Sequence, residues 1–161
     1  MRGGRLAAAA LLLAACGGDE GRPEPRVADI EPALAAVERA RGGPQQFFEA
    51  NATPQRVNVF VAADGATTVV PYVYVDGELG PAGPPTPASG ATFAASAVTF
   101  DPEHVLGQVT TDLPETELLV FSVVGGPGEA VRYGVVARSA AGGTLDITLS
   151  PQGNVLAVDA R

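Results

Sequence analysis

Apolar residues recur at every second position over much of this chain, and this period restricts its fold more than any other feature. Such alternation is typical of β-strands, whose successive side chains point to opposite faces of a sheet. Runs of Gly, Pro, Asn and Asp, which favour turns, separate the alternating segments. The strands that the pattern predicts cover residues 56–62, 67–75, 91–100, 118–124, 130–138, 144–149 and 155–159.

The connections between these runs carry their own signals. Asp64-Gly65 is a hairpin turn sequence between the first two strands. Pro71 cannot donate a backbone hydrogen bond, so its strand is expected at an edge or a bulge of the sheet. Residues 77–90 contain four prolines and predict a surface loop. We weigh two interpretations of this loop, a partner-contacting arm at the rim of the sheet or, in preference, an insertion without a role.

Two segments have helical rather than strand spacing. A helix is predicted over residues 29–41, with Asp29 as its N-cap and Gly42 in a left-handed conformation after its end. A second helix is expected to open at Asp101-Pro102-Glu103 and to stop at Pro114. Residues 44–50 are expected to add a short helical turn that carries Phe47 and Phe48.

The two halves of the chain share a sequence pattern, which suggests an internal duplication. The helix sequence from Asp29 to Val37 matches the one from Asp101 to Val109 in four residues, and Val59-Phe60 matches Val120-Phe121. Coincidence between amphipathic helices followed by Val-rich strands is the alternative. The duplication predicts an α+β fold, in which tandem αβββ repeats of about 28–100 and 101–161 form one antiparallel sheet. That sheet would have six or seven strands, two helices on one face, and a concave exposed face.

Composition excludes several function classes. All ten basic residues are arginines, and two lie in the first five positions, which leaves eight against 18 acidic residues and a net charge of −10. Such a balance opposes binding to nucleic acid. Without lysine there is no Schiff-base or P-loop chemistry. The single cysteine, Cys16, leaves no disulfide, so a hydrophobic core must hold the fold together.

No residue pattern predicts catalysis, a metal site or a cofactor. His104 is the only histidine and falls early in a predicted helix, where an exposed histidine is unremarkable. The acidic groups Asp112/Glu115/Glu117 and Asp76/Glu78 would suit a glycosidase pair or a weak Ca²⁺ site, but solvated turns are the favoured interpretation. We therefore expect a protein that is not an enzyme.

Three tyrosines are the candidates for contact with a partner. Tyrosine anchors many protein interfaces, and the chain has only Tyr72, Tyr74 and Tyr133 and no tryptophan. Alternation places Tyr72 and Tyr74 on the same face of their strand. Whether that face meets the core or the solvent stays open at the level of sequence.

The first sixteen residues form a separate unit. Arg2 and Arg5 precede a continuous apolar stretch over residues 6–13, which is shorter than the roughly 20 residues of a membrane-spanning helix. Leu13-Ala14-Ala15-Cys16 resembles the lipobox of bacterial lipoproteins. The resemblance implies that residues 1–15 are a cleaved signal peptide, and that lipid on Cys16 anchors the protein to a membrane. The alternatives are an ordinary secretory signal with an incidental cysteine, or a misassigned start.

Residues 16–26 then predict a flexible tether, and residues 27–161 a single α+β domain. The expected location is the cell membrane or the outer membrane, with the domain facing the periplasm or the extracellular space. The expected role is the binding of a protein partner or a small ligand through the sheet face, or alternatively a structural or assembly-assisting role without a soluble ligand. The predicted architecture resembles tandem-repeat binding domains such as the β-lactamase inhibitory proteins, at the level of the fold alone.

Overall fold

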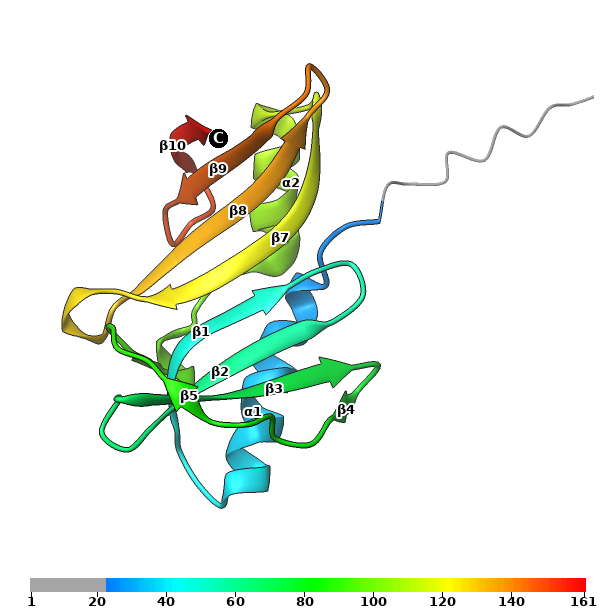
Figure 1. Cartoon of the computed structure of the whole chain (residues 1–161). Helices are drawn as coiled ribbons and strands as arrows, with labels where there is room; N and C mark the ends of the chain where they lie inside the picture. The colour runs from blue at the N-terminus through cyan, green and yellow to red at the C-terminus, as the bar shows by residue number, and fades with distance from the viewer. Residues whose placement is uncertain (1–22) are drawn as a thin grey trace, which may run out of the picture.

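Residues 23–161 of the chain are described by a computed structural model, shown in Figure 1. They form one antiparallel sheet with two α-helices, which is the α+β class that the sequence predicts. The helices are α1 (Ile30–Arg41) and α2 (Pro102–Asp112). The strands are β1 (Gln46–Ala52), β2 (Val57–Ala63), β3 (Thr68–Val75), β4 (Glu78–Leu79), β5 (Thr86–Pro87), β6 (Phe93–Ala94), β7 (Thr116–Gly125), β8 (Val131–Ser139), β9 (Thr144–Leu149) and β10 (Val155–Ala160).

The strand order in the sheet is β10-β9-β8-β7-β1-β2-β3-β4, with β5 beside β3 and β6 beside β1. Of the ten strands, seven have six residues or more, namely β1, β2, β3, β7, β8, β9 and β10. The antiparallel contact between β1 and β7 joins the first half of the chain to the second. In Figure 1 both helices lie behind the sheet.

The core lies between the helices and one face of the sheet. Helix α1 buries Ile30, Leu34 and Val37, and α2 buries Val105 and Val109. The strands contribute alternate residues to the same core, as the period of two predicts. Aromatic rings fill its centre, where Phe121 lies 5.4 Å from Phe100 and 6.1 Å from Tyr133 between ring centroids.

The start and stop signals of the two predicted helices were confirmed, except that one cap makes no hydrogen bond. The Asp101 carboxylate accepts hydrogen bonds from the backbone N–H groups of Glu103 and His104, at 3.1 and 3.2 Å, and so caps α2. Gly42 takes the predicted left-handed conformation after α1, with φ of 81°. Asp29 occupies the predicted N-cap position of α1, but it ends a 3₁₀ turn (Val27–Asp29), has helical backbone angles and makes no side-chain capping bond. Its carboxylate instead pairs with Arg26 at 2.7 Å.

Two predicted elements differ in the structure. The helical turn expected over residues 44–50 is wrong, since this segment forms strand β1. Its neighbouring phenylalanines hide the period of two because a β-bulge lies between Phe47 and Glu49. The strand expected over residues 91–100 is reduced to the two residues of β6, after which Ala95–Ala97 form a 3₁₀ turn.

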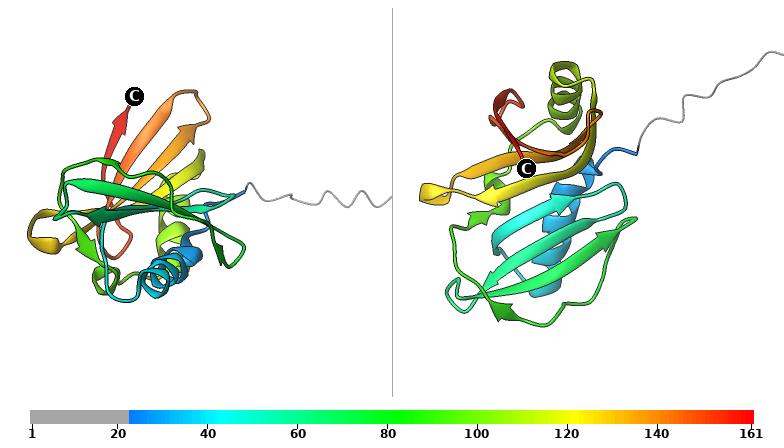
Figure 2. Two further views of the ribbon diagram at one scale, coloured as in Figure 1. Left: turned by 60° about the horizontal axis from the view of Figure 1, so that its bottom comes forward. Right: turned by 45° about the horizontal axis from the view of Figure 1, so that its top comes forward.

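The sheet is not flat. The left view of Figure 2 shows that strands β8, β9 and β10 turn away from the plane of β3, as twist requires in a sheet of this width. The sequence match of Val59-Phe60 with Val120-Phe121 aligns β2 of the first half with β7 of the second. In the sheet, however, β7 is the inner strand of its half, next to β1, whereas β2 lies one strand further out, so that match does not relate equivalent positions.

Candidate functional site

The sheet face turned away from α1 and α2 carries no helix within residues 23–161, and we call it the open face (Figure 1). Burial alternates sharply across the sheet. On β2, for example, Val57, Val59 and Val61 are fully buried, whereas Asn58 and Phe60 point to the open face and are half-buried. The open face is therefore a regular surface, free of helices within residues 23–161, that the fold offers to a partner.

A row of polar side chains crosses the middle of the open face. Register places Thr148 of β9 opposite Gly134 of β8, Gly134 opposite Ser122 of β7, and Ser122 opposite Asn51 of β1. Asn51 in turn lies opposite Asn58 of β2. Asn58 Nδ2 donates to Asn51 Oδ1 at 2.8 Å, which orders this part of the row. The row offers hydroxyl and amide groups in fixed positions to a contacting molecule.

A hollow interrupts this row at Gly134, and we call it the Gly134 hollow. It measures about 290 Å³ and lies over β7, β8 and β9. It exists because Gly134 has no side chain, while its cross-strand neighbours Ser122 and Thr148 do. Its lining on the open face includes Ser122, Val124, Arg132, Gly134, Val136, Asp146 and Thr148. Apolar walls with a few polar groups at defined positions are typical of binding pockets.

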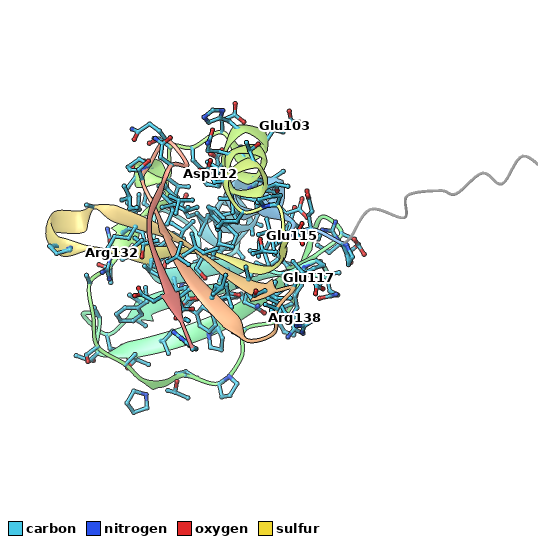
Figure 3. All side chains as sticks on the ribbon, turned by 90° about the horizontal axis from the view of Figure 1, so that it is seen from above. Glu103, Asp112, Glu115, Glu117, Arg132 and Arg138 are labelled. Carbon is cyan, nitrogen blue, oxygen red and sulfur yellow. The ribbon has the colours of Figure 1, made fainter. Side chains whose placement is uncertain are left out.

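The two charged side chains of the Gly134 hollow differ in their surroundings. Asp146 forms an ion pair with Arg161, so its charge is already matched. Arg132 is exposed and makes no ion pair with the side chains that the structure describes. Figure 3 shows Arg132 far from Arg138, which lies toward the other end of β8 and pairs with Glu117 at 2.9 Å. Arg132 is thus available for an anionic or hydrogen-bond-accepting group.

A larger hollow of about 530 Å³ lies between the segment 24–28 and helix α2. Its lining includes the acidic residues Glu24 and Glu103 and one basic residue, Arg26. Arg26 is engaged with Asp29 at 2.7 Å and with Asp76 at 2.6 Å. The hydrogen bonds to Asp76 and Asp29 raise the pKa of Arg26 above its ordinary value. Because these partners already occupy the arginine, we place the candidate site at the Gly134 hollow and not here.

The three tyrosines predicted to contact a partner lie in the core instead of on the open face. Tyr72 and Tyr74 are each 8% exposed, and Tyr133 is 2% exposed. The Tyr72 hydroxyl accepts a hydrogen bond from Arg41 at 3.3 Å, and the Tyr133 hydroxyl accepts one from the backbone N–H of Thr99 at 3.3 Å. Burial raises the pKa of Tyr133. So little of these side chains reaches the surface that the proposal below rests on other residues.

Of the first predicted acidic group, Glu115 and Glu117 line one hollow of about 220 Å³ together with Arg138, whereas Asp112 is not part of its lining. Figure 3 shows Asp112 on α2 and Glu115 and Glu117 toward the start of β7, and Asp112 accepts a hydrogen bond from Gln108 at 3.0 Å. Asp76 pairs with Arg26, and Glu78 is exposed. Within the described residues, no three His, Cys, Asp or Glu side chains come together as metal ligands would. His104 lies exposed on α2, as the sequence suggested.

The lipid-attachment candidate, Cys16, and the predicted signal peptide lie outside the described residues. Within residues 23–161, neither helix has the length and hydropathy needed to cross a bilayer.

Sequence reasoning missed the Gly134 hollow, although a signal was present. Gly134 stands inside the alternating run of residues 131–139, and a glycine within a strand marks a bulge or a close approach to another group. No bulge occurs at this residue, where β8 keeps regular pairing with both neighbours. No close approach requires a glycine here either, since a Cβ would meet only the Ile147 carbonyl oxygen at an ordinary 3.5 Å, so the open space above Gly134 is what distinguishes this residue.

Comparison with known proteins gives no family for this chain. It matches no protein-family model, and searches among curated proteins and solved structures returned no match either.

Proposed function

We propose that this protein is a lipid-anchored protein of the cell envelope that binds a partner protein through the open face. The Gly134 hollow is the observation that carries the binding proposal, since it combines apolar walls with Arg132 and two hydroxyl groups. The location rests on the lipobox-like sequence that ends at Cys16. No chemistry is assigned, and the proposed role is binding rather than catalysis.

The surface around the hollow favours a protein partner over a free ligand. At about 290 Å³ the hollow has the volume of a small ligand pocket, but it is part of a polar row that crosses five strands of the open face. A space of this size suits one anchoring side chain of a partner, whose remaining surface would lie along the polar row from Asn58 to Thr148. The exposed Val73, at the end of the same row, extends this surface across β3.

We further propose that the fold arose by duplication of an αβββ unit. The strand order is symmetric about the β1–β7 contact, with β2 and β3 on one side and β8 and β9 on the other. A β-bulge lies at the corresponding place in each half, next to the pair Phe47–Val61 in the first and the pair Leu118–Ala137 in the second. Shared irregularities support common descent better than shared strands do, because bulges are conserved features.

The anchor is tested by replacing the predicted lipidated residue. In cells that make the full chain, we expect the wild type to sediment with membranes and to be released only by detergent. The variant Cys16→Ala should lose the anchor and move to the soluble or secreted fraction, because one thioether carries the lipid. An equal share of both forms in the membrane fraction would contradict the proposal.

The binding site is tested by filling the hollow without disturbing the fold. A Cβ on Gly134 would meet only the Ile147 carbonyl oxygen, at an ordinary 3.5 Å, so Gly134→Val is compatible with strand β8. From detergent-solubilised native membranes, we expect the Gly134→Val variant to recover at least tenfold less partner protein than the wild type does. The control Gly107→Ala changes an open position on α2 and should recover the partner as the wild type does.

The same experiment separates the two functions considered from the sequence. Recovery that Gly134→Val abolishes and Gly107→Ala preserves supports a binding module. If the wild type and both variants recover the same proteins, the hollow is not the site. If none of them recovers a partner, a structural role without a soluble ligand replaces the proposal.

A further inference from the structure

Beyond β3 the sheet is closed by the Pro-rich segment 77–90. Strands β4 and β5 pair with the two ends of β3. Between them the N–H groups of Gly80 and Gly83 donate to the carbonyls of Val73 and Pro71, each at 2.8 Å. The segment therefore covers this edge along its length (Figure 1), which prevents a partner from adding a strand there. On this side of the sheet, recognition is left to the side chains of the open face.

Arg132 is the one basic side chain that lines the Gly134 hollow. Strand β8 directs Arg132 and Gly134 to the same face, because the two residues are two positions apart. The Arg132 side chain is exposed. Because Gly134 has no side chain, nothing on β8 separates the Arg132 guanidinium from the space of the hollow.

The acidic side chains nearest to Arg132 on the open face have other partners. Asp146, which also lines the hollow, is paired with Arg161. Glu49 lies two strands from Arg132, on β1, so about 10 Å separates the two backbones. The Glu49 carboxylate accepts a hydrogen bond from Asn51 Nδ2 at 2.8 Å. Among the side chains that the structure describes, no carboxylate therefore neutralises Arg132.

Two hydroxyl groups flank the same space. Ser122 of β7 and Thr148 of β9 lie directly opposite Gly134, one on each side. Neither side chain is buried, so both hydroxyls can donate to a group that enters the hollow. A carboxylate can accept several hydrogen bonds, including two from a single guanidinium. The donors of the hollow therefore match a carboxylate.

The net charge of the chain makes a carboxylate contact at this place selective. The formal charge is −8, so most of the surface repels an acidic group. The neighbouring arginines, Arg138 and Arg161, are paired with Glu117 and Asp146. An acidic group that approaches the open face is thus attracted at Arg132, which would fix the position of a partner.

We propose that the side chain with which the partner protein anchors itself in the Gly134 hollow is an aspartate or a glutamate. Its carboxylate binds the Arg132 guanidinium and accepts hydrogen bonds from the hydroxyls of Ser122 and Thr148. A basic anchor would meet the like charge of Arg132, and an apolar anchor would bury the guanidinium without a partner, which is costly. This inference rests on the binding function proposed above and names the chemistry of the partner at that site.

Removal of one charge at a time tests the contact. From detergent-solubilised native membranes, we expect Arg132→Gln to recover at least tenfold less partner protein than the wild type does. Arg138→Gln removes the same charge from the same strand and the same face, but at a position that Glu117 already pairs. This control should recover the partner as the wild type does. Equal recovery by the wild type and Arg132→Gln would overturn the inference.

The absence of lysine from the chain allows the contacting group to be identified. Arg132→Lys keeps the positive charge and introduces the only ε-amino group of the chain. A carbodiimide activates a carboxylate, and the amine then forms an amide with it while the activating group leaves as a urea. In native membranes, we therefore expect carbodiimide to link this variant to an aspartate or glutamate of the partner, which mass spectrometry of the joined peptides identifies.

Two control variants tie the cross-link to the hollow. Arg39→Lys places the same amine at an exposed position on α1, on the other side of the sheet, and should give no adduct. Gly134→Val combined with Arg132→Lys should lose the adduct, because valine fills the hollow.

The outcomes distinguish this inference from the binding proposal on which it rests. A partner that the wild type recovers and Gly134→Val does not, without an adduct at position 132, would overturn the acidic anchor and leave the binding function standing. Equal adducts at positions 132 and 39 would do the same. A wild type that recovers no partner would overturn both.

Discussion

Two glycines with opposite surroundings allow a sharp test of the packing between the halves of the sheet. Gly125 ends strand β7 and is buried where the segment before β6 crosses it. A Cβ on Gly125 would lie 2.2 Å from the Ala91 carbonyl oxygen, 2.5 Å from its carbon and 2.8 Å from the Thr92 nitrogen. These are backbone atoms, so Gly125→Ala forces the crossing segment to move.

The expected cost of Gly125→Ala follows from this geometry. Overpacking costs about 1–3 kcal/mol, and we expect about 3 kcal/mol because the displaced segment also positions Phe93. That side chain is fully buried and lies 5.8 Å from Phe47 between ring centroids. For a chain of this size, about 3 kcal/mol corresponds to a Tm lower by about 6–12 °C.

Gly107→Ala is the matched change with the opposite sign. A Cβ at this position on α2 meets nothing within 4 Å, and alanine favours a helix over glycine by about 0.5–1 kcal/mol. Urea unfolding of the wild type and both variants should show a lower midpoint for Gly125→Ala and a higher one for Gly107→Ala, with unchanged slopes. Equal midpoints, or shifts in the same direction, would refute the packing described at Gly125.

Two further predictions concern a cap and a buried phenol. Asp101→Ala should lower the stability by about 1 kcal/mol through loss of the α2 cap. Asp29→Ala should cost less, since it removes a partly exposed ion pair with Arg26 and no capping bond. Urea midpoints in the reverse order would contradict the assignment of the caps. Because burial raises the pKa of Tyr133 above its ordinary 10.0, the unfolded chain loses this proton at a lower pH than the folded chain. The contribution of the Tyr133 phenol to the stability is thus fully present below pH 10.0 and is lost as the pH rises through the folded-state pKa. In that pH range the urea midpoint of the wild type should fall more steeply than that of Tyr133→Phe. Parallel curves of urea midpoint against pH would contradict this.

Local signals were sufficient for most elements. The Asp101-Pro102 start of α2, the left-handed Gly42 after α1 and the Asp64-Gly65 turn between β2 and β3 all act within a few residues, so a sequence reveals them. Pro71 likewise predicted an edge position, and β3 has only two-residue strands beyond it.

The incorrect predictions have two physical causes, which are contacts between residues far apart in the sequence and interruptions of the alternating apolar pattern. Strand β1 was missed because its bulge interrupts the alternation, so that two large apolar residues, Phe47 and Phe48, follow each other in the sequence. The cover that segment 77–90 forms over β3 depends largely on backbone groups such as those of Gly80 and Gly83, which carry no sequence signature. The face of β3 that carries Tyr72 and Tyr74 is buried because α1 packs on that side of the sheet. The side on which a helix packs is set by the tertiary structure and cannot be read from the alternation of residues.

The proposal as a whole depends most on where the protein resides, and the mass of the native protein tests this most directly. We expect protein purified from cell membranes to begin at Cys16 and to carry the added mass of a diacylglyceryl group, with further acyl chains where the host adds them. A native chain that retains Met1 together with an unmodified Cys16 thiol would contradict the account.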